Sequence, residues 1–321
     1  MENNNQINWC NKQHNRLTDP FGLPYKEYSS WNGEGNYYFI LHFRDRDEFQ
    51  YKAELRHPNV FLILTDILEG YALRRFSKID QFVCNNNLQG KVIFATCLVD
   101  AEKEYAAWTD SPNFQTLYYP EWYHRVYDNL YDYYLDKLSY NKTQYFCCLN
   151  NRPHDHRIST VDYLLENKLE THGLVTSVHH NLLIDGEGSR PNDYNRAIYK
   201  DTLINVVTET HYEPHWNKYH HIFLSEKTWK PIICKQAFII IGPKHTLKYL
   251  KELGFKTFDH LWDESYDNCD SHNRLYIALN SLYNTINGYT IDELNRATID
   301  VRKHNLNHFK SIRESMIKTC T

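Results

Sequence analysis

The sequence lacks several features that would each point to a particular class of protein. No apolar run approaches the roughly 20 residues that a membrane-spanning helix needs. The N-terminus, MENNNQINWC, is polar rather than a basic segment followed by an apolar one. We therefore expect neither a membrane anchor nor a signal sequence, and we expect the protein in the cytoplasm. No internal repeat is visible.

Cysteine spacing and charge exclude further classes. The eight cysteines form no CxxC pair and show no regular spacing, which argues against a zinc site and against a disulfide framework. The 36 Lys and Arg residues against 40 Asp and Glu residues give a formal net charge of −4. This balance provides no overall electrostatic reason to bind a polyanion, so any contact with nucleic acid would need a local basic patch.

What the sequence does contain is typical of a globular α/β protein. Its 321 residues are enough for two domains of ordinary size. The 26 Tyr and seven Trp residues are many; such side chains suit half-buried sheets as well as sites that bind sugars or bases. We predict two α/β domains, residues 1–140 and 141–321.

The N-terminal half shows the alternation that a parallel sheet needs. Residues 1–35 lack sustained periodicity and are expected to form an irregular arm. Short apolar runs follow at Tyr37–Phe43, Val60–Thr65 and Lys91–Cys97, separated by stretches that can hold helices. From residue 111 to 144, aromatic residues recur at helical spacing and the segment ends in a polar turn. The predicted domain boundary lies near that turn.

The C-terminal half repeats the pattern. A strand is predicted at Tyr145–Leu149, followed by the polar turn NNRPHDHR and a helix, and a second strand at LINVVTET. The run Ala237–Ile241, closed by Gly242, has the continuous apolar character of a buried parallel strand. Residues 291–318 place apolar side chains among charges as amphipathic helices do.

The segment SEKTWKPI has the features of a ligand-binding helix start. Ser225 can act as the N-cap, and Glu226 and Lys227 then lie in the first turn. Free backbone N–H groups and the helix dipole favour an anion there. A carboxylate beside a lysine at this place can hold a ribose hydroxyl and a diphosphate together. The alternative is a surface helix start with an ordinary charge pair.

The turn NNRPHDHR puts polar side chains between a buried strand and a helix, where open α/β sheets bind ligands. Arg152 and Arg157 could each give a diphosphate two parallel hydrogen bonds. His154 and His156 with Asp155 could be metal ligands, but no further ligand lies at a recognised spacing. We therefore predict no metal site here.

An acidic segment, DHLWDESYDNCD, offers a different kind of site. Its carboxylates are Asp259, Asp263, Glu264, Asp267 and Asp270. Such a cluster suggests a divalent cation, and the alternative is a solvated acidic loop. Trp262 and Tyr266 would stack on a sugar or base if they face a ligand, and otherwise belong to the core.

Several segments together resemble a family of glycosyltransferases common in bacteriophages and marine viruses. They are CLNNRPHDHRISTVDYLLENKL, INVVTET, FLSEKTWKPIICKQAFIIIG, LGFKTFDHLWDESYD and the HN of KHNLNHF. The first three are also similar to the α1,3-fucosyltransferase pattern, in which an Arg follows a strand, a Glu ends a second strand and a Glu-Lys turn precedes an apolar strand. The resemblance covers roughly Phe146 to Asp267.

This resemblance implies a GT-B fold, in which two Rossmann-like domains face a cleft and the second binds most of the nucleotide sugar. Arg157, with Arg152 as the competitor for the role, would clamp the diphosphate. Glu226 would face the ribose or sugar, Lys227 would neutralise the phosphates, and Glu209 would lie near the transferred sugar. No metal or other cofactor is implied as a requirement, and the nucleoside diphosphate sugar is the co-substrate. IICKQ and VVTETHYE depart from the fucosyltransferase pattern and argue against fucose as the donor sugar.

The catalytic base is sought in the N-terminal half, because the acceptor side of this fold usually comes from there. Asp66 closes the predicted strand VFLILTD, and a carboxylate at a strand's carboxyl end points toward the ligand side of the sheet. It would remove a proton from the acceptor hydroxyl as the sugar carbon develops oxocarbenium character. A helix N-cap is the alternative role. Asp45, Asp47 and Glu48 are further candidates.

Three functions remain open at this point. The first is glycosyl transfer to a hydroxyl on a saccharide, a protein or a hydroxymethylated pyrimidine in phage DNA, with no membrane partner and, for a viral protein, in the cytoplasm of the host cell. The second is a non-catalytic viral protein that binds a nucleotide or a glycan. The third is a metal-dependent hydrolase that uses the acidic segment, whose activity would be lost on chelation.

Overall fold

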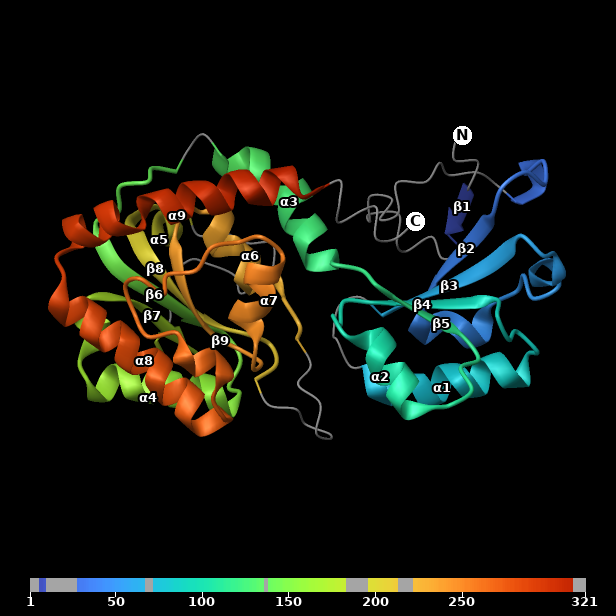
Figure 1. Ribbon diagram of the computed structural model, residues 1–321, viewed down its shortest axis with the longest axis horizontal. Coiled ribbons are helices and arrows are strands. Elements are labelled where there is room, and N and C mark those ends of the chain that lie inside the picture. Colours follow the sequence, from blue (N-terminus) through green and yellow to red (C-terminus); the bar gives the residue numbers. More distant parts are fainter. Residues whose placement is uncertain are drawn as a thin grey trace. The chain divides into compact units, whose positions relative to one another are not determined.

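A computed structural model describes residues 6–9, 28–66, 72–135, 138–182, 196–212 and 222–313 (Figure 1). The chain divides into two compact units between Glu121 and Trp122. Each unit is built on a parallel sheet. The predicted class, α/β with two Rossmann-like units, is therefore confirmed.

The first unit contains five parallel strands that follow one another in chain order across the sheet. They are β1 (Gln6–Trp9), β2 (Tyr37–His42), β3 (Val60–Asp66), β4 (Val92–Thr96) and β5 (Gln115–Tyr118). The three strands predicted from apolar runs, β2, β3 and β4, are confirmed. Strand β1 differs from expectation, because it lies within the segment predicted to be an irregular arm and pairs with β2.

The helices of the first unit lie on one face of its sheet (Figure 1). Parallel strands joined in a single direction by right-handed connections place every connecting helix on the same side. The helices are α1 (Ala72–Asn85) and α2 (Ala101–Trp108), with short 3₁₀ turns η2 (Tyr28–Ser30), η3 (Phe43–Glu48) and η4 (Glu54–Arg56). Phe76 of α1 packs with Phe94 of β4 in the core between helices and sheet.

The second unit has four parallel strands in the order β7-β6-β8-β9. Their bounds are β6 (Gln144–Asn150), β7 (Gly173–Ser177), β8 (Thr202–Thr208) and β9 (Ala237–Ile241). The helices are α3 (Glu121–Leu135), α4 (Asp155–Glu166), α5 (Arg196–Asp201), α6 (Glu226–Ile233), α7 (Thr246–Glu252), α8 (Ser271–Gly288) and α9 (Ile291–Ser311). Short 3₁₀ turns occur at η5 (Leu169–Thr171) and η6 (Ser265–Asn268).

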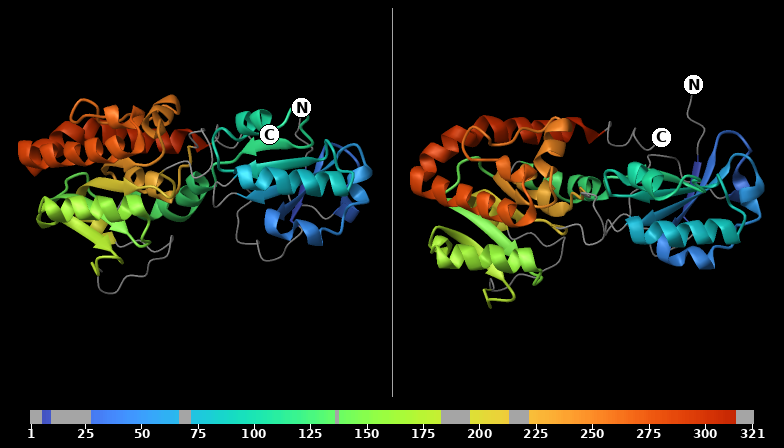
Figure 2. Two further views of the ribbon diagram at one scale, coloured as in Figure 1. Left: turned by 90° about the horizontal axis from the view of Figure 1, so that it is seen from below. Right: turned by 60° about the horizontal axis from the view of Figure 1, so that its bottom comes forward.

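Strand order gives the second unit a topological switch point. From β6 the chain moves to β7 on one side, and then returns to β8 on the other side of β6. Helix α4 therefore lies on one face of the sheet together with α8, and α6 lies on the opposite face together with α9 (Figures 1 and 2). In sheets of this kind, a ligand crevice opens at the carboxyl ends of the two strands where the direction reverses. Here those strands are β6 and β8.

A buried glutamine fixes how β9 starts beside β8. Gln236 is 1% exposed; its Nε2 donates to the carbonyl (3.0 Å) and hydroxyl (2.8 Å) of Thr202. Its Oε1 accepts a hydrogen bond of 3.1 Å from Nδ2 of Asn205. Both ends of the buried amide are thus hydrogen-bonded to polar side chains or backbone of β8.

The boundary between the units lies earlier in the chain than the expected position between residues 140 and 141. Helix α3 is the reason. Tyr123 is fully buried, its ring contacts Trp229 and Phe309, and its hydroxyl donates to the Phe309 carbonyl. The aromatic spacing predicted this helix correctly but did not show which core it joins.

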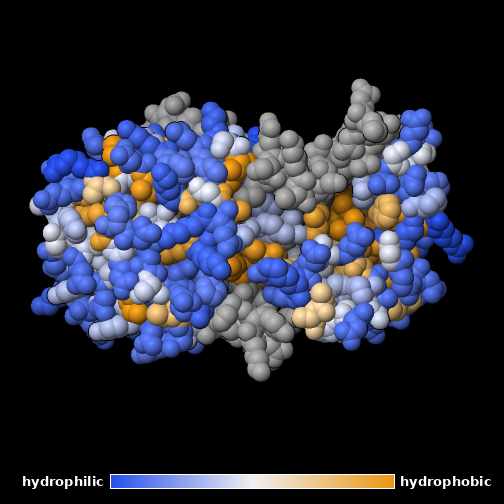
Figure 3. Space-filling view, viewed as in Figure 1, coloured by the Kyte–Doolittle hydropathy of each residue, from blue (hydrophilic) through white to orange (hydrophobic). Residues whose placement is uncertain are grey.

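The surface seen in Figure 3 is mostly hydrophilic, with apolar residues in small groups between polar ones. Within the described ranges, no helix combines the length and apolar character required to cross a bilayer.

Helix α9 is joined to the loops around it by side-chain amides. Nδ2 of Asn295 donates to the Lys142 carbonyl (2.7 Å), and its Oδ1 accepts from the Lys142 backbone N–H (3.1 Å). Asn305 makes the same pair of bonds with the backbone of Lys256, both at 2.8 Å. These amides pair with the backbone as a neighbouring strand would.

Asn295→Ala should lower the free energy of unfolding by about 2 to 4 kcal/mol, because it leaves the N–H and C=O of the buried Lys142 without partners. Asn307→Ala, which changes an exposed residue of the same helix, should stay within about 0.5 kcal/mol of the wild type. Urea denaturation followed by circular dichroism measures both. Equal losses in the two variants would contradict the assignment.

Candidate functional site

The carboxyl ends of β7, β6 and β8 are joined by polar side chains. Thr208, the last residue of β8, donates its hydroxyl to Oδ1 of Asn150, the last residue of β6. The backbone N–H of Asn150 donates to Oγ1 of Thr176 on β7 at 3.1 Å. These contacts fix the carboxyl ends of β6 and β8, and the segments that follow these two strands carry Arg157 and Glu209.

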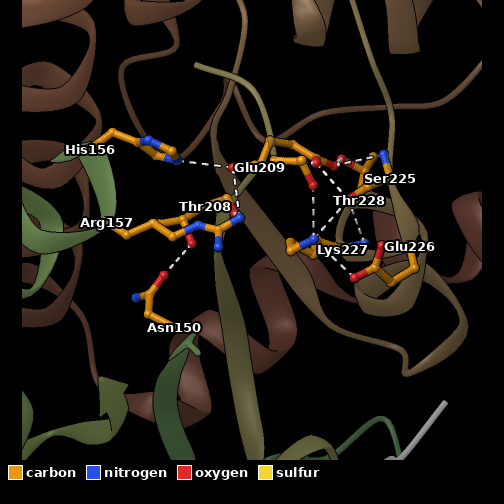
Figure 4. A network of polar contacts seen from close by, with 10 residues as sticks. Asn150, His156, Arg157, Thr208, Glu209, Ser225, Glu226, Lys227 and Thr228 are labelled. Carbon is orange, nitrogen blue, oxygen red and sulfur yellow. Dashed lines mark hydrogen bonds and ion pairs between the residues drawn. The ribbon is translucent and has the colours of Figure 1, made fainter. Parts of the chain in front are cut away.

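Glu209 follows β8 and is fully buried, yet its carboxylate has four hydrogen-bond donors. Oε1 accepts from the Ser225 backbone N–H (3.1 Å) and the Thr228 hydroxyl (2.7 Å). Oε2 accepts from the Ser225 hydroxyl (2.6 Å) and the Thr210 backbone N–H (2.8 Å). Figure 4 shows the carboxylate facing the start of α6, so Glu209 joins the end of β8 to that helix.

The predicted helix start at Ser225 is confirmed. Its Oγ accepts from the backbone N–H of Lys227 at 3.2 Å, as an N-cap does. Lys227 Nζ lies 2.9 Å from Oε1 of Glu226 and also donates to Oγ1 of Thr210 at 3.1 Å. The Glu226 side chain is only 10% exposed and that of Lys227 27%, so this is not an ordinary surface charge pair.

Two lysines keep Glu226 ionised. Burial by itself raises the pKa of the Glu226 carboxyl, but the charges of Lys227 and Lys230, together with hydrogen bonds from Lys227 and the backbone, bring the pKa below its ordinary value. Lys230 is itself 9% exposed, and burial lowers its pKa. The start of α6 therefore combines one carboxylate with two cations.

Arg157 is a buried cation in the first turn of α4, 5% exposed. Its Nη2 donates to the carbonyls of Glu209 (3.1 Å) and Thr208 (3.4 Å). Among the described residues no carboxylate lies at ion-pair distance from it, and its Nε has no hydrogen-bond acceptor. Burial is the main cause that lowers the pKa of Arg157. The carboxylates of Glu209 and Glu226 attract its charge from beyond ion-pair distance. Because a buried charge without a direct ion pair is costly, this guanidinium is suited to an anionic ligand.

His156 is a neutral neighbour of Arg157. Its Nε2 lies 2.9 Å from the Glu209 carbonyl and must donate to it, since a carbonyl only accepts (Figure 4). The ring stacks on Tyr212, with centroids 5.1 Å apart and planes at 17°. Burial lowers the pKa of His156 to about 3. His156 thus braces the same carbonyl as Arg157 without adding charge.

Arg152 lies in the loop between β6 and α4 and is exposed. Its charge is near enough to contribute to the lowered pKa of Arg157. The two arginines predicted as competitors are therefore neighbours at one edge of the sheet, and Arg157 is the deeper of the two.

Asp66 belongs to the first unit, where it ends β3 and is 3% exposed. Its Oδ2 forms an ion pair of 2.5 Å with Nε of Arg75 on α1. The Arg75 guanidinium also lies over the Phe43 ring, 4.9 Å from its centroid. The charge of Asp66 is thus balanced by Arg75, which belongs to the helix that follows β3. The other candidates, Asp45, Asp47 and Glu48, lie on η3.

The carboxylates of the acidic segment accept hydrogen bonds from nearby backbone N–H groups. Asp267 accepts hydrogen bonds from the backbone N–H groups of Leu247 (2.8 Å) and Lys248 (2.9 Å) at the start of α7. Asp270 is the N-cap of α8 and accepts from the Asn273 N–H at 3.1 Å.

Its other carboxylates are also engaged. Glu264 accepts from the Phe258 N–H (2.7 Å), Asp263 from the Ser265 N–H (2.8 Å), and Asp259 pairs with Lys251 (2.9 Å). In the described part of the chain, no three His, Cys, Asp or Glu side chains are placed to hold a metal ion.

The two aromatic residues of the acidic segment belong to the core. Trp262 is 5% exposed and stacks on Phe258, and Tyr266 is fully buried with its hydroxyl accepting from the Ile240 N–H. Of the two possibilities open from the sequence, stacking on a ligand and packing in the core, the structure shows the second.

Sequence reasoning missed the residues that hold the site together. Asn150, Thr208 and Thr228 carry no functional motif, and only their positions give them a role. The available signal was their position in the sequence. Asn150 directly follows one predicted strand, Thr208 lies near the end of another, and Thr228 stands three residues after the predicted N-cap.

The chain matches no known protein-family model, and curated proteins give no sequence match. A solved structure that is similar in fold is a mutant of BGT from phage T4 in complex with UDP-glucose. The identity is 10%, the TM-score is 0.41, and the match covers 98% of this chain and 96% of that chain. A likeness of this size assigns no residue.

The lowered pKa of His156 predicts acid sensitivity with a definite sign. Between its ordinary pKa of about 6.5 and its folded value of about 3, the unfolded chain binds the proton and the folded chain does not. The unfolding free energy should therefore fall as the pH drops from 6.5 to 4.5, by about 2 to 3 kcal/mol from this residue.

His156→Gln keeps an N–H donor for the Glu209 carbonyl and removes the titration. Unfolding curves at several pH values should show the wild type losing its advantage over this variant as the pH falls. His272→Gln, at an exposed position, should follow the wild type. A stability difference that is constant from pH 6.5 to 4.5 would show that His156 does not titrate as described.

Proposed function

We propose that the protein is a glycosyltransferase of GT-B type that binds a nucleoside diphosphate sugar at the carboxyl ends of β6 and β8. The observation that carries the proposal is Arg157, a buried guanidinium without a carboxylate partner at ion-pair distance among the described residues, at a topological switch point. A diphosphate is a fitting counter-ion, because its oxygens accept the parallel hydrogen bonds that a guanidinium donates.

The neighbouring groups contact different parts of the donor. Lys227 exchanges its bond to Glu226 for the phosphates, and the N-termini of α4 and α6 add favourable helix dipoles. Glu226, released from Lys227, then accepts from ribose or sugar hydroxyls. Arg152 reaches the same anion from its exposed loop. As the bond to the sugar breaks, charge builds on the leaving diphosphate, and these fixed cations stabilise it.

Two carboxylates are proposed for the transfer itself. Asp66 acts as the base for the acceptor hydroxyl, once it has exchanged Arg75 for the acceptor. Glu209 was predicted beside the transferred sugar, and its four hydrogen bonds support a positioning role there: it holds the start of α6 in place.

The acceptor is proposed to be a hydroxyl of a saccharide, of a protein or of a hydroxymethylated pyrimidine in phage DNA. No metal is required in this scheme, because arginine, lysine and helix ends neutralise the diphosphate. The second candidate, a non-catalytic protein that binds the nucleotide or a glycan, uses the same residues without turnover.

Nucleotide binding should stabilise the protein against heat. A ligand at a concentration of 100 Kd contributes about 2.7 kcal/mol, which corresponds to a rise in Tm of about 5 to 10 °C for a unit of this size. Differential scanning fluorimetry with UDP, GDP, CMP and dTDP and their sugars should reveal one series that produces such a rise.

Lys227→Ala and Arg157→Gln should weaken that series by at least tenfold in Kd. Lys248→Ala, which removes an exposed lysine of α7, should leave it unchanged. If no nucleotide or nucleotide sugar raises the Tm, the proposed donor site is wrong. A shift without release of nucleoside diphosphate on long incubation with candidate acceptors would favour the non-catalytic alternative.

Substitutions of Asp66 and Glu209 should affect different kinetic constants. Asp66→Asn should lower kcat by about 100-fold, the size expected for loss of a general base, and leave the KM for the donor unchanged. Glu209→Gln should raise the donor KM first, because it loosens the start of α6. A single-turnover assay of donor cleavage measures both. If Asp66→Asn instead raises the donor KM and Glu209→Gln instead lowers kcat, the two proposed roles are wrong.

A further inference from the structure

The exposed face of α8 has an unusual composition for this chain. About a quarter of the sequence is charged, but Arg274 is the only Asp, Glu, Lys or Arg among the 18 residues of this helix and is itself 3% exposed. Outward positions hold Tyr276 and Tyr283, which are 55% and 39% exposed. Tyr289, just beyond the helix, is 40% exposed. The face is aromatic, polar and uncharged.

The tyrosines and amides form one stripe along α8. Positions 276, 280, 283 and 287 are spaced by three or four residues, so they lie on one side of the helix. At a rise of about 1.5 Å per residue the stripe is about 16 Å long. Tyr, Asn, Tyr and Asn occupy these positions in turn.

The groups of the stripe are held in place by contacts already made. The Tyr276 ring stands edge-on to Tyr163 of α4, with centroids 6.1 Å apart and planes at 86°. The Tyr163 hydroxyl donates to Oδ1 of Asn280 at 2.6 Å, which fixes the amide and leaves its N–H donors for a ligand. Nδ2 of Asn287 donates to the Tyr283 carbonyl at 2.9 Å, which leaves its Oδ1 as an acceptor.

We propose that this face binds a neutral oligosaccharide. Sugar rings present C–H groups that pack on tyrosine faces, and hydroxyls that both donate to Asn287 and accept from Asn280. An uncharged, hydroxyl-rich ligand loses nothing by meeting a face without charge. This face is separate from the proposed donor site and does not depend on the proposed transfer, but it would keep a glycan acceptor attached to the protein.

A second copy of the chain fits this face less well. Stable protein interfaces bury a core that is poor in polar groups. The exposed positions of α8 are His272, Asn273, Tyr276, Tyr283, Asn284, Asn287 and Gly288. They include no Leu, Ile, Val, Met or Phe. The combination of tyrosine rings and amides is better matched to a polyol.

The test is affinity electrophoresis in gels that contain neutral polysaccharides: soluble starch, glucomannan, galactomannan and hydroxyethyl cellulose. At least one should retard the wild-type protein. The Tyr276→Ala/Tyr283→Ala double variant should bind at least tenfold more weakly, and its Tm should stay near the wild-type value because both side chains are exposed. Tyr51→Ala, which removes a 36% exposed tyrosine of the first unit, is the matched control.

Three results would overturn the proposal. They are no retardation by any of the four polymers, retardation that is equal in the double variant, and concentration-dependent self-association of the wild type that the double variant loses. The donor site is tested separately, since retardation should persist in Lys227→Ala. Loss of nucleotide binding therefore leaves this inference standing, and loss of glycan binding leaves the donor site standing.

Discussion

The buried carboxylate of Glu209 is the contact on which the second unit's site depends. A fully buried carboxylate is tolerated only when its oxygens are satisfied, and here two backbone N–H groups and two hydroxyls satisfy them. Because three of those four donors come from Ser225 and Thr228 at the start of α6, the Glu209 carboxylate helps to fix where that helix begins. The same residue's carbonyl receives Arg157 and His156 from α4. One residue thus connects two helix starts to one strand end.

In this arrangement, the residues that fix the helix starts differ from the residues that are proposed to bind a ligand. Neutral groups around Glu209, such as Thr228 and His156, make their hydrogen bonds to Glu209 itself. The cations Arg157 and Lys227 lie around this frame; Arg157 has no carboxylate at ion-pair distance within the described ranges, and Lys227 has one that it can exchange. A frame whose polar groups already have partners, next to cations that can change partners, is a suitable basis for recognising an anion, because little of the frame needs to reorganise on binding.

The sequence predicted much of this because some signals are local. The apolar runs of β2, β3, β4 and β9, and the N-cap at Ser225, depend on residues that are neighbours in the chain. What could not be predicted depends on partners far away in sequence. Strand β1 has four residues and exists as a strand only through its pairing with β2.

The acidic segment shows the same limit. Five carboxylates close together indicate metal or solvent when only their spacing is known. Whether Asp267 binds a cation or caps α7 is decided by which backbone N–H groups lie opposite it, and those belong to residues about 20 positions earlier. The burial of Trp262 and Tyr266 was undecidable for the same reason. Assignment of α3 to the second unit likewise needed Phe309, at the other end of that unit.

The amide of Gln236 gives the sheet a property that apolar packing alone would not. Side chains on a strand alternate between faces, so a slip of β9 against β8 by one residue would exchange buried faces and move α6 along the sheet by about 3.3 Å. Valine and isoleucine on both sides would tolerate several alignments almost equally well. A buried amide that meets Thr202 and Asn205 has only one satisfactory alignment. Gln236 therefore fixes the register of β9 against β8. Because α6 leads directly into β9, this register also helps to set the position of the start of α6 relative to the start of α4.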